Sequence, residues 1–370
     1  MHIGLVIYGS LDSVSGGYLY DRKLVEYLRR QGDQVSVVAL PWRSYVRHLG
    51  DNFSFSFFRR LRDLDVDILL EDELNHPSLF RLNHRLKRQK RYPLVPIVHH
   101  LRSSEQDHDW RNFFFRRLEA RFLNSADAFI FNSQATRQVV ESLHPKGANL
   151  PQPWVVAYPA GDRFQPQLSL ADITHRGGES GPLRLVFVGN LIPRKGLHIL
   201  LQALKAFSPQ ELMLTVVGNL EVDPHYVERI RAQISDLGLA EQVRLLGALD
   251  DQALTDCLQT QHVLAVPSAY EGFGIVYLEG MGFGLPAIAS TQGGAREIIS
   301  SGENGFLIDF RDAERSTRLL VQCLDAFHRD RELLVQMSLA AYRRYTQHPG
   351  WQQTGKRIRL FLQNLLYQEG

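Results

Sequence analysis

Residues 265–308 read AVPSAYEGFGIVYLEGMGFGLPAIASTQGGAREIISSGENGFLI, and this stretch decides the fold. An apolar run at 263–266 ends at a Pro-Ser pair. A glutamate follows at Glu271, and the glycines at 272 and 274 allow a tight backbone turn before a helical pattern begins. We therefore expect a strand, a loop and a helix. Seven residues separate Glu271 from Glu279, so we expect Glu271 on the loop and Glu279 about two turns into the helix, on the same face.

Two carboxylates in this arrangement predict a site for polar ligands. Both can point into one cleft, where a carboxylate accepts hydrogen bonds from hydroxyl groups. Free backbone N–H groups at the start of the helix, with glycines beside them, would form an anion site. Hydroxyls and a phosphate are the expected ligand groups. Either glutamate taken alone could instead be a helix cap or part of a solvated helix face.

The motifs of this stretch resemble the donor-binding signature of the family-4 retaining glycosyltransferases, which have the GT-B fold. They are P-S-x-x-E-G-F-G-I-V-x-L-E-G-M at 267–281, G-L-P at 284–286 and G-G-A-R-E-I-I at 293–299. The resemblance implies that Glu271 is a catalytic residue that binds the hydroxyls of the transferred sugar, and that Glu279 binds the ribose of its nucleotide. It also implies that Phe273, Gly274 and Ile275 belong to the donor site.

A second loop carries positive charge. Residues 188–196 read VGNLIPRKG and follow a strand expected at 183–188. Arg194 and Lys195 on such a loop could neutralise a diphosphate, the leaving group of a nucleotide-sugar reaction, or could simply be solvated. The loop resembles the family's Gly-Arg-x-x-x-x-Lys-Gly element, which implies that Lys195 is a donor-binding and catalytic residue. Asn190 stands where the family usually has arginine, and Arg194 could supply the missing charge.

The chain opens with a strand at 2–8, a loop rich in Gly and Ser at 9–17, a helix at 18–30 and a strand at 34–40. Gly16 and Gly17 resemble the glycine pair with which the family's first loop approaches the donor, although such a pair is more often simple turn chemistry. A strand expected at 94–98 delivers His99 and His100 to its carboxyl end. A histidine there resembles the family's residue near the donor sugar, and we favour His99 for this catalytic role. Either histidine could instead cap the strand or pair with a carboxylate.

Strands and helices alternate along the whole chain, which predicts an α/β protein with parallel sheets. In the GT-B fold these form two Rossmann-like, doubly wound domains that face a central cleft. We expect an acceptor-side domain at 1–165 and a donor domain at 183–349. Residues 166–182 mix Pro, Ser, Gly and charge without periodicity and are expected to be a linker. In this fold the final amphipathic helix, 350–370, returns to complete the first domain.

Composition argues against several other classes of protein. Cys257 and Cys323 are the only cysteines, so we expect neither a disulfide framework nor a cysteine metal cluster. A formal net charge of +2 argues against a nucleic-acid binder. No apolar run approaches the length of a membrane span, and residues 3–8 lack the features of a signal peptide. We expect a cytoplasmic enzyme without metal or cofactor, because basic residues and helix N-termini can carry the diphosphate charge.

Three segments of the first half combine basic and aromatic residues. They are 53–62 (FSFSFFRRLR), 81–91 with six Lys or Arg and no acid, and 113–117 (FFFRR). Lys and Arg can bind anionic lipid headgroups while Phe enters the membrane interface. The segments therefore suggest a protein peripheral to the inner face of a membrane, with a lipid or lipid-linked acceptor. Basic helix faces are, however, usually just solvated, and the phenylalanines could belong to the core.

Together these features predict a retaining, metal-independent glycosyltransferase of the hexosyltransferase type. It would move a sugar from a nucleotide-sugar to a hydroxyl of a glycan, lipid-linked or polysaccharide-precursor acceptor. Two alternatives stay open. A sugar-nucleotide epimerase can share the fold but needs acid/base carboxylates in the cleft. A non-catalytic nucleotide-sugar binding protein is favoured only by Asn190. The sequence leaves open the nucleotide base, the sugar and the acceptor.

Overall fold

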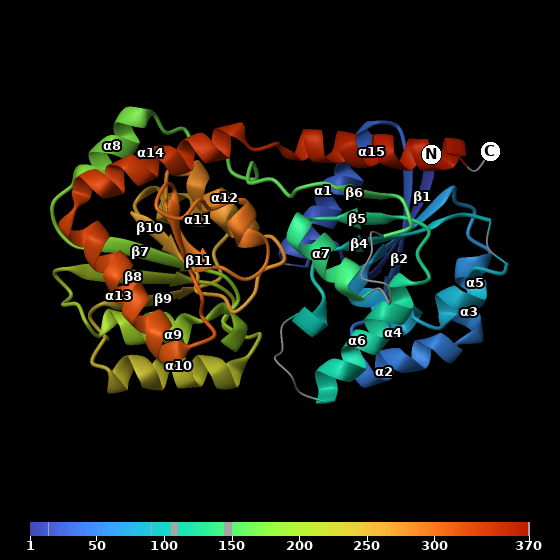
Figure 1. The fold of residues 1–370 in the computed structure, drawn as a ribbon, viewed down its shortest axis with the longest axis horizontal. Helices are drawn as coiled ribbons and strands as arrows, with labels where there is room; N and C mark the ends of the chain where they lie inside the picture. The colour runs from blue at the N-terminus through green and yellow to red at the C-terminus, as the bar shows by residue number, and fades with distance from the viewer. Residues whose placement is uncertain (14, 90, 105–109, 144–149, 369–370) are drawn as a thin grey trace. The chain divides into compact units, whose positions relative to one another are not determined.

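The computed structural model describes residues 1–370 except 14, 90, 105–109, 144–149 and 369–370. The chain forms two compact units, Met1–Pro159 with Pro349–Gly370 (unit 1) and Ala160–His348 (unit 2). Within the described residues each unit contains a six-stranded parallel sheet with helices around it (Figure 1). This arrangement confirms the predicted α/β fold with two parallel sheets.

The sheet of unit 1 has the strand order β2-β1-β3-β4-β5-β6. Its pairings are all parallel, with Ile3 of β1 opposite Val35 of β2 and Ile68 of β3. Strand β4 is buried throughout, as expected of a central parallel strand that helices cover on both faces. The strands are β1 (His2–Tyr8), β2 (Gln34–Leu40), β3 (Ile68–Asp72), β4 (Leu94–Val98), β5 (Phe129–Phe131) and β6 (Trp154–Val156).

The first helix of unit 1 begins earlier than expected. Ser15 caps it by accepting a hydrogen bond from the backbone N–H of Tyr18, so Gly16 and Gly17 lie in its first turn and not in the preceding loop. The helices of this unit are α1 (Gly16–Arg30), α2 (Tyr45–Leu49), η1 (Gly50–Phe53), α3 (Phe55–Arg62), η2 (Glu73–Asn75), α4 (His76–Leu79), α5 (Leu82–Leu86), η3 (Arg102–Ser104), α6 (Trp110–Leu123), α7 (Gln134–Leu143) and α15 (Trp351–Gln368).

The C-terminal helix α15 packs against α1 (Figure 1). Its Thr354 hydroxyl donates to the carbonyl oxygen of Tyr158 at 2.7 Å, and Arg359 Nε lies 2.7 Å from Asp33 Oδ2. Gly355 faces the ring of Tyr27 so closely that an added Cβ would lie 2.4 Å from Cγ. The last segment of the chain is therefore an integral part of unit 1.

The sheet of unit 2 has the order β12-β11-β10-β7-β8-β9. Its strands are β7 (Leu183–Val188), β8 (Leu212–Val217), β9 (Val243–Gly247), β10 (Val263–Ala265), β11 (Ala287–Ser290) and β12 (Gly305–Ile308). Its helices are α8 (Leu170–Gly178), η4 (Pro193–Lys195), α9 (Leu197–Leu204), α10 (Pro224–Asp236), α11 (Asp251–Gln259), α12 (Ile275–Gly282), η5 (Gly294–Glu297), α13 (Ala313–Arg329) and α14 (Arg331–Gln347). Among the described residues of both units, no helix is long and apolar enough to cross a membrane.

Our expectation of an irregular linker at 166–182 is wrong in one respect, because this segment contains helix α8. Ser169 and Asp172 form a capping box at its start, in which each side chain binds the backbone N–H of the other. The helix packs against α14, and its buried Arg176 donates to the carbonyl oxygen of Phe283 at 2.5 Å. These contacts make α8 part of unit 2.

We predict that Gly355→Ala destabilises the protein by about 1–3 kcal/mol, because the new methyl group would overpack against Tyr27. Urea denaturation of the variant and the parent protein measures this difference. Gly178→Ala is the matched control: a Cβ there meets nothing within 4 Å, so the helix α8 should gain up to about 1 kcal/mol. Equal stability of the two variants would contradict the packing of α15 described above.

Candidate functional site

Two loops of unit 2 lie against each other at the carboxyl ends of β7 and β10. The backbone N–H of Ala269 donates to the carbonyl oxygen of Arg194 at 2.8 Å. Gly196 has a φ of +74°, and a Cβ there would come within 2.0 Å of the carbonyl oxygen of Pro267. A side chain at 196 would therefore push the loops apart. This close approach brings the basic loop beside the loop that carries Glu271.

Lys195 and Glu271 form an ion pair where the two loops meet. Lys195 Nζ donates to Glu271 Oε1 at 2.5 Å, and the buried Ser268 hydroxyl donates to the same oxygen at 2.6 Å. Arg194 Nη1 lies 4.0 Å from Glu271 Oε2 and donates to the carbonyl oxygen of Tyr270 at 2.8 Å. Glu271 is only 7% exposed. Burial raises its pKa, but Lys195 and Arg194 outweigh that effect and lower the pKa to about 2. Glu271 is thus ionised.

The G-G-A-R-E motif packs against the same loop. Gly293 pairs with Glu271 in a parallel bridge, and Gly294 donates its backbone N–H to the carbonyl oxygen of Glu271 at 2.8 Å. A Cβ on Gly293 would lie 2.0 Å from that oxygen, so a glycine is required. The motifs at 188–196 and 293–299 thereby hold the backbone of the loop that carries Glu271.

Glu279 has a different environment from Glu271. Helix α12 begins at Ile275, so Glu279 is its fifth residue and lies little more than one turn into the helix, not two turns as expected. It is 7% exposed, and its Oε1 has no hydrogen-bond partner among the described residues. Burial raises its pKa to about 7, and the Arg163 guanidinium, 3.8 Å away, offsets this only in part. This carboxyl group therefore has unused acceptor capacity, although Oε1 itself is enclosed by the protein.

The other residues predicted for the donor site connect these two glutamates. Phe273 is buried, Gly274 adopts a φ of +94° at the N-terminal cap of α12, and Ile275 begins the helix. In unit 2 the structure thus brings Arg194 and Lys195 onto Glu271 and places Glu279 one helical turn after this loop. The predicted residues Gly16, Gly17 and His99 belong to unit 1.

In unit 1, His99 follows β4 and lies among buried carboxylates. Its Nε2 is 3.0 Å from Asp21 Oδ1, and its backbone N–H donates to Glu73 Oε2 at 2.8 Å. Asp21 comes from α1, and Asp72 is the last residue of β3. Gly17 lies directly against the imidazole, where a Cβ would be 3.3 Å from Cδ2. The glycine pair and His99, predicted separately, therefore share one site.

The carboxylates determine the charge of His99. Burial lowers the pKa of the imidazole, but the charge and the hydrogen bond of Asp21, with help from Glu73 and Asp72, raise it to about 9. Burial, together with the charge of Asp21, raises the pKa of Asp72 to about 7, and burial raises that of Glu73 well above its usual value. We therefore expect His99 to be an imidazolium ion at neutral pH, paired with Asp21.

Sequence reasoning missed Asp21, Asp72, Glu73 and Ser268. Asp21 follows Gly17 by four residues, so helical spacing could have placed it on the same face. Asp72 and Glu73 follow an apolar run and Glu71, at the carboxyl end of a strand. Ser268 is part of the Pro-Ser pair that we quoted only as a motif. The half-buried His100 is not part of the Asp21 cluster.

One group among the described residues has the composition of a metal site. Ligand atoms of Asp21, Asp72 and His99 lie within 4.8 Å of one another. A cation there would compete with the proton between His99 Nε2 and Asp21 Oδ1, which the short contact already uses. These residues fit a proton better than a metal ion. Our expectation of metal independence stays a prediction.

Two family models match the chain in succession. The model for "Glycosyltransferase Family 4" matches residues 20–150, and the model for "Glycosyl transferases group 1" matches residues 174–344. The first match lies within unit 1, where it leaves out β1 and β6, and the second lies within unit 2 and includes its whole sheet.

Curated proteins and solved structures are similar to the chain as well. It is 29% identical over 246 residues to a D-inositol 3-phosphate glycosyltransferase of Streptomyces avermitilis, covering 64% of this chain and 49% of that protein. The chain thus spans about half the length of that relative. It is 27% identical over 375 residues to a phosphatidyl-myo-inositol mannosyltransferase of Mycobacterium leprae, with 93% of both chains covered. A structure of Anabaena Alr3699/HepE with UDP and glucose superimposes with a TM-score of 0.74 at 21% identity, covering 98% of this chain and all of the other. That last likeness concerns the fold alone.

We predict that Lys195→Met lowers the free energy of unfolding at pH 7 by about 3 kcal/mol, because it leaves the Glu271 carboxylate buried without its partner. The lowered pKa of Glu271 stabilises the folded protein. This stabilisation is complete above about 4.3, the ordinary pKa of a glutamate in the unfolded chain, and it is lost as the pH falls toward the folded-state pKa of about 2. The difference in unfolding free energy between the parent protein and the variant should therefore become smaller between pH 4 and pH 3.

Urea unfolding followed by circular dichroism at these pH values measures that difference. The exposed Lys205 offers the control Lys205→Met, which should change stability by less than about 0.5 kcal/mol. A difference that is the same at pH 7 and pH 3 would show that Lys195 does not hold Glu271 ionised.

We also predict that Asp21→Asn lowers the pKa of His99 from about 9 to below its ordinary 6.5, because burial then outweighs the remaining attraction of Asp72 and Glu73. An NMR titration of the histidine side chains reports this value directly. Asp33→Asn, which breaks the distant pair with Arg359, should leave the titration of His99 unchanged. A His99 pKa that stays above 8 in Asp21→Asn would refute the role of Asp21.

Proposed function

Because the chain belongs to glycosyltransferase family 4, with the GT-B fold, we propose that it transfers a sugar from a nucleotide-sugar donor to an acceptor hydroxyl with retention of anomeric configuration. The donor would bind in unit 2, on the loops that carry Lys195 and Glu271 and on helix α12. The observation that carries this proposal is the pair between the half-buried Lys195 and the buried Glu271, with a second buried carboxyl group, Glu279, on the helix that follows the same loop.

Lys195 would bind the diphosphate. Its ammonium group has three N–H donors, and Glu271 Oε1 takes one of them. The others can reach a diphosphate oxygen without breaking the pair. During transfer the bond from the anomeric carbon to the diphosphate breaks, and negative charge develops on the leaving oxygen. A fixed cation next to that oxygen stabilises the charge more in the transition state than in the ground state.

Glu271 would bind hydroxyl groups of the transferred sugar. Lys195 and Ser268 occupy its Oε1, and Oε2 faces Arg194 at 4.0 Å. The second oxygen therefore keeps acceptor capacity for a sugar hydroxyl, and the low pKa keeps the carboxylate an acceptor throughout the neutral range. Glu279 would accept hydrogen bonds from the vicinal hydroxyls of the ribose through Oε2, because Oε1 is enclosed by the protein.

His99 would act from unit 1. As an imidazolium tied to Asp21 through Nε2, it can still donate from Nδ1. A cationic donor suits a sugar hydroxyl or an anionic group of the acceptor. His99 is not suited to act as a general base, because its imidazole already carries the second proton at neutral pH. The acceptor proton would then leave to an oxygen of the departing diphosphate, which agrees with retention and requires no metal.

The acceptor is proposed from the relatives. One is named for D-inositol 3-phosphate and another for phosphatidyl-myo-inositol. We propose an acceptor of that chemical class, a polyol that carries a phosphate, free or attached to a lipid. An epimerase of the same fold would convert the donor without any acceptor, and a non-catalytic binding protein would leave it intact. Product analysis with the donor alone distinguishes these alternatives.

We predict that Lys195→Ala weakens the binding of nucleoside diphosphates and of nucleotide-sugars by about 1.5–3 kcal/mol, which is roughly 10- to 150-fold in Kd, because a charge-assisted contact is lost. Glu271→Gln should instead reduce turnover more than it reduces the affinity for the nucleoside diphosphate, since its partner is the sugar.

Calorimetric titration with a panel of uridine, guanosine and adenosine diphosphates and their sugars measures the affinities. Lys205→Ala, which changes an exposed lysine at the end of α9, serves as the control. Unchanged affinities in Lys195→Ala, or an equal loss of turnover and nucleotide affinity in Glu271→Gln, would contradict the assigned roles.

A further inference from the structure

Unit 1 exposes large aromatic side chains next to arginines. Of the four phenylalanines in the segment 53–58, Phe57 and Phe58 are buried in the core, whereas Phe53 is 67% exposed and Phe55 is 61% exposed. Segment 53–58 therefore contributes both to the core and to the surface. A phenylalanine that exposes more than half of its side chain needs an explanation when a charged cluster surrounds it.

Arginines of two helices lie around these rings. The guanidinium groups of Arg59 and Arg81 lie over the rings of Phe55 and Phe53 at 5.1 and 5.0 Å from the centroids. Arg85 of α5 lies over the buried Phe58 of α3 at 4.5 Å, so the two helices form one continuous surface. We call this surface, made of Phe53, Phe55, Arg59, Arg60, Arg81 and Arg85, the arginine–phenylalanine face.

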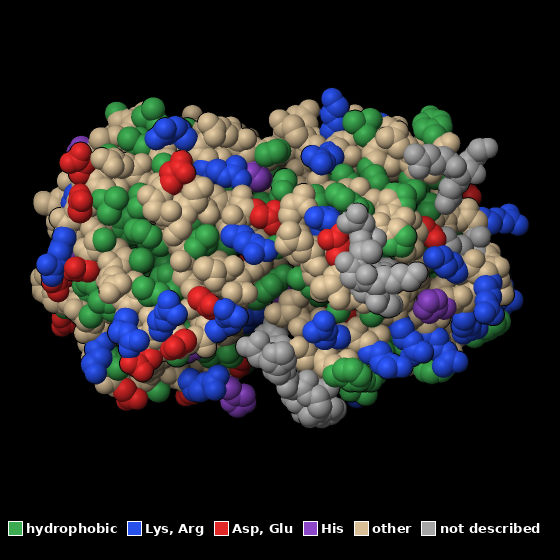
Figure 2. Space-filling model, in the orientation of Figure 1, with side chains coloured by type: hydrophobic (Ala, Val, Ile, Leu, Met, Phe, Trp, Pro, Cys, Tyr) green, Lys and Arg blue, Asp and Glu red, His purple; other side chains and the backbone are tan. Residues whose placement is uncertain are grey.

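Among the described residues, the arginines of this face have no carboxylate as an ion-pair partner, and only the charge of Asp63 acts on Arg59 from a distance. Within the described residues, none of Arg59, Arg60, Arg81 and Arg85 forms an ion pair. The nearby acids are already engaged: Asp51 binds Arg43, and Asp63 binds Arg62. Figure 2 shows Lys and Arg side chains gathered over the region of α3 and α5, with apolar side chains beside them. The face thus combines positive charge with apolar tips.

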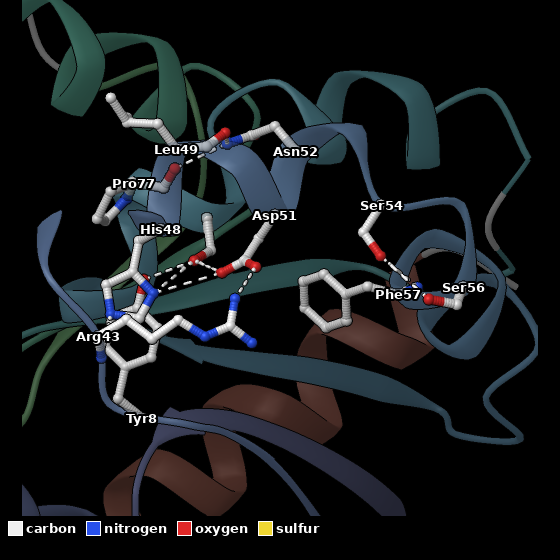
Figure 3. A network of polar contacts seen from close by, with 11 residues as sticks. Tyr8, Arg43, His48, Leu49, Asp51, Asn52, Ser54, Ser56, Phe57 and Pro77 are labelled. Carbon is white, nitrogen blue, oxygen red and sulfur yellow. Dashed lines mark hydrogen bonds and ion pairs between the residues drawn. The ribbon is translucent and has the colours of Figure 1, made fainter. Parts of the chain in front are cut away.

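A partly buried polar network holds this surface on the sheet of unit 1 (Figure 3). Asp51 accepts a hydrogen bond from Ser78 at 2.7 Å, and Ser78 also bonds to Tyr8 at the end of β1, at 2.6 Å. His48 stacks on Tyr8 with ring centroids 3.9 Å apart. The segment that carries Phe53 is therefore fixed to the end of the first strand.

Asn52 secures the other side of the same segment. Its amide donates to the carbonyl oxygen of Pro77 at 2.7 Å, and its side-chain oxygen accepts from the backbone N–H of Arg81 at 2.8 Å. Asn52 is fully buried, so these bonds form out of contact with water. The hydrogen bonds of Asn52 thus hold Phe53 at the surface, and Phe53 could enter the core only if these bonds broke.

The apolar character continues onto the neighbouring helices. Val46 of α2 is 74% exposed, and the adjacent Tyr45 packs edge-to-face on Phe115 of α6 with ring centroids 5.0 Å apart. On α6, Phe113 and Phe114 are exposed while Phe115 is buried. These exposed apolar side chains come from several helices, and such a dispersed set suits the fluid surface of a bilayer better than one protein partner.

We propose that the arginine–phenylalanine face binds the surface of an anionic lipid bilayer, with its arginines on the lipid phosphates and with Phe53 and Phe55 in the interface. Arginine binds phosphate oxygens through paired N–H groups, and aromatic rings are favourable at the depth of the headgroups. The protein is then peripheral to a membrane whose facing leaflet is anionic. This inference uses only unit 1 and is independent of the proposed sugar transfer.

Co-sedimentation with vesicles tests this proposal. The full chain is mixed with vesicles of phosphatidylcholine alone and of phosphatidylcholine with about one third phosphatidylglycerol, at low and at moderate salt. We expect binding only to the anionic vesicles and weaker binding at higher salt, because the Debye length shortens. Each basic residue near such a surface contributes roughly fivefold to the partition coefficient, so Arg59→Glu/Arg60→Glu should reduce binding by more than about tenfold.

Two further variants separate insertion from simple charge attraction. Phe53→Ser/Phe55→Ser keeps every charge and should also reduce binding several-fold, because it removes the apolar tips. Lys205→Glu/Arg231→Glu and Val222→Ser/Leu246→Ser make the same kinds of change at exposed positions of unit 2 and should bind vesicles like the parent protein. Nucleoside diphosphate affinity should stay unchanged in all four variants, which shows that the fold and the donor site are intact.

Three outcomes would overturn the proposal. The first is no binding to anionic vesicles at low salt. The second is an equal loss of binding in the unit 1 variants and in the unit 2 controls. The third is a loss in Arg59→Glu/Arg60→Glu with full binding by Phe53→Ser/Phe55→Ser, which would identify a general polyanion site, such as one for nucleic acid. If any of these outcomes occurred while nucleoside diphosphate binding stayed normal, the membrane proposal would be wrong, but the proposed transfer reaction would not be affected.

Discussion

The ion pair between Lys195 and Glu271 is the constraint on which the donor region depends. Removing two charges from water is costly, so a buried pair persists only if its geometry is good and its other hydrogen bonds are satisfied. Here Ser268 supplies the additional bond, and the backbones of Gly196 and Gly293 press against the Glu271 loop to hold it in place. The sequence motifs of this region are the residues that make that close packing of three loops possible.

The pair also keeps hydrogen-bonding groups with which, in our proposal, it would bind a ligand. Lys195 keeps two N–H donors and Glu271 keeps one oxygen free of Lys195 and Ser268, so a donor can be added to the pair without replacing it. In unit 1 the Asp21–His99 pair also joins opposite charges, and there both partners are buried. Preorganised charges of this kind are worth more in a dry site than in water.

The sequence predicted the alternation of strands and helices and the two loops that carry Lys195 and Glu271, because glycine-bounded motifs at strand ends determine both. It did not predict that these two side chains form an ion pair. Helix α8 was missed although Ser169 and Asp172 form an S-x-x-D signal, since we gave more weight to the Pro and Gly residues around it. The Asp21–His99 pair spans 78 residues and depends on the strand order β1-β3-β4, which local pattern does not encode. The rotation of α3 about its axis relative to α5 likewise decides which phenylalanines of 53–58 are buried.

A crystal structure of the protein with an intact nucleotide-sugar bound tests the central claim most directly. The account predicts that Lys195 Nζ lies within hydrogen-bond distance of a diphosphate oxygen while it still contacts Glu271, and that the other oxygen of Glu271 accepts from a sugar hydroxyl. It also predicts that Glu279 accepts hydrogen bonds from the ribose hydroxyls. A diphosphate bound away from Lys195, or a sugar that makes no contact with Glu271, would contradict it.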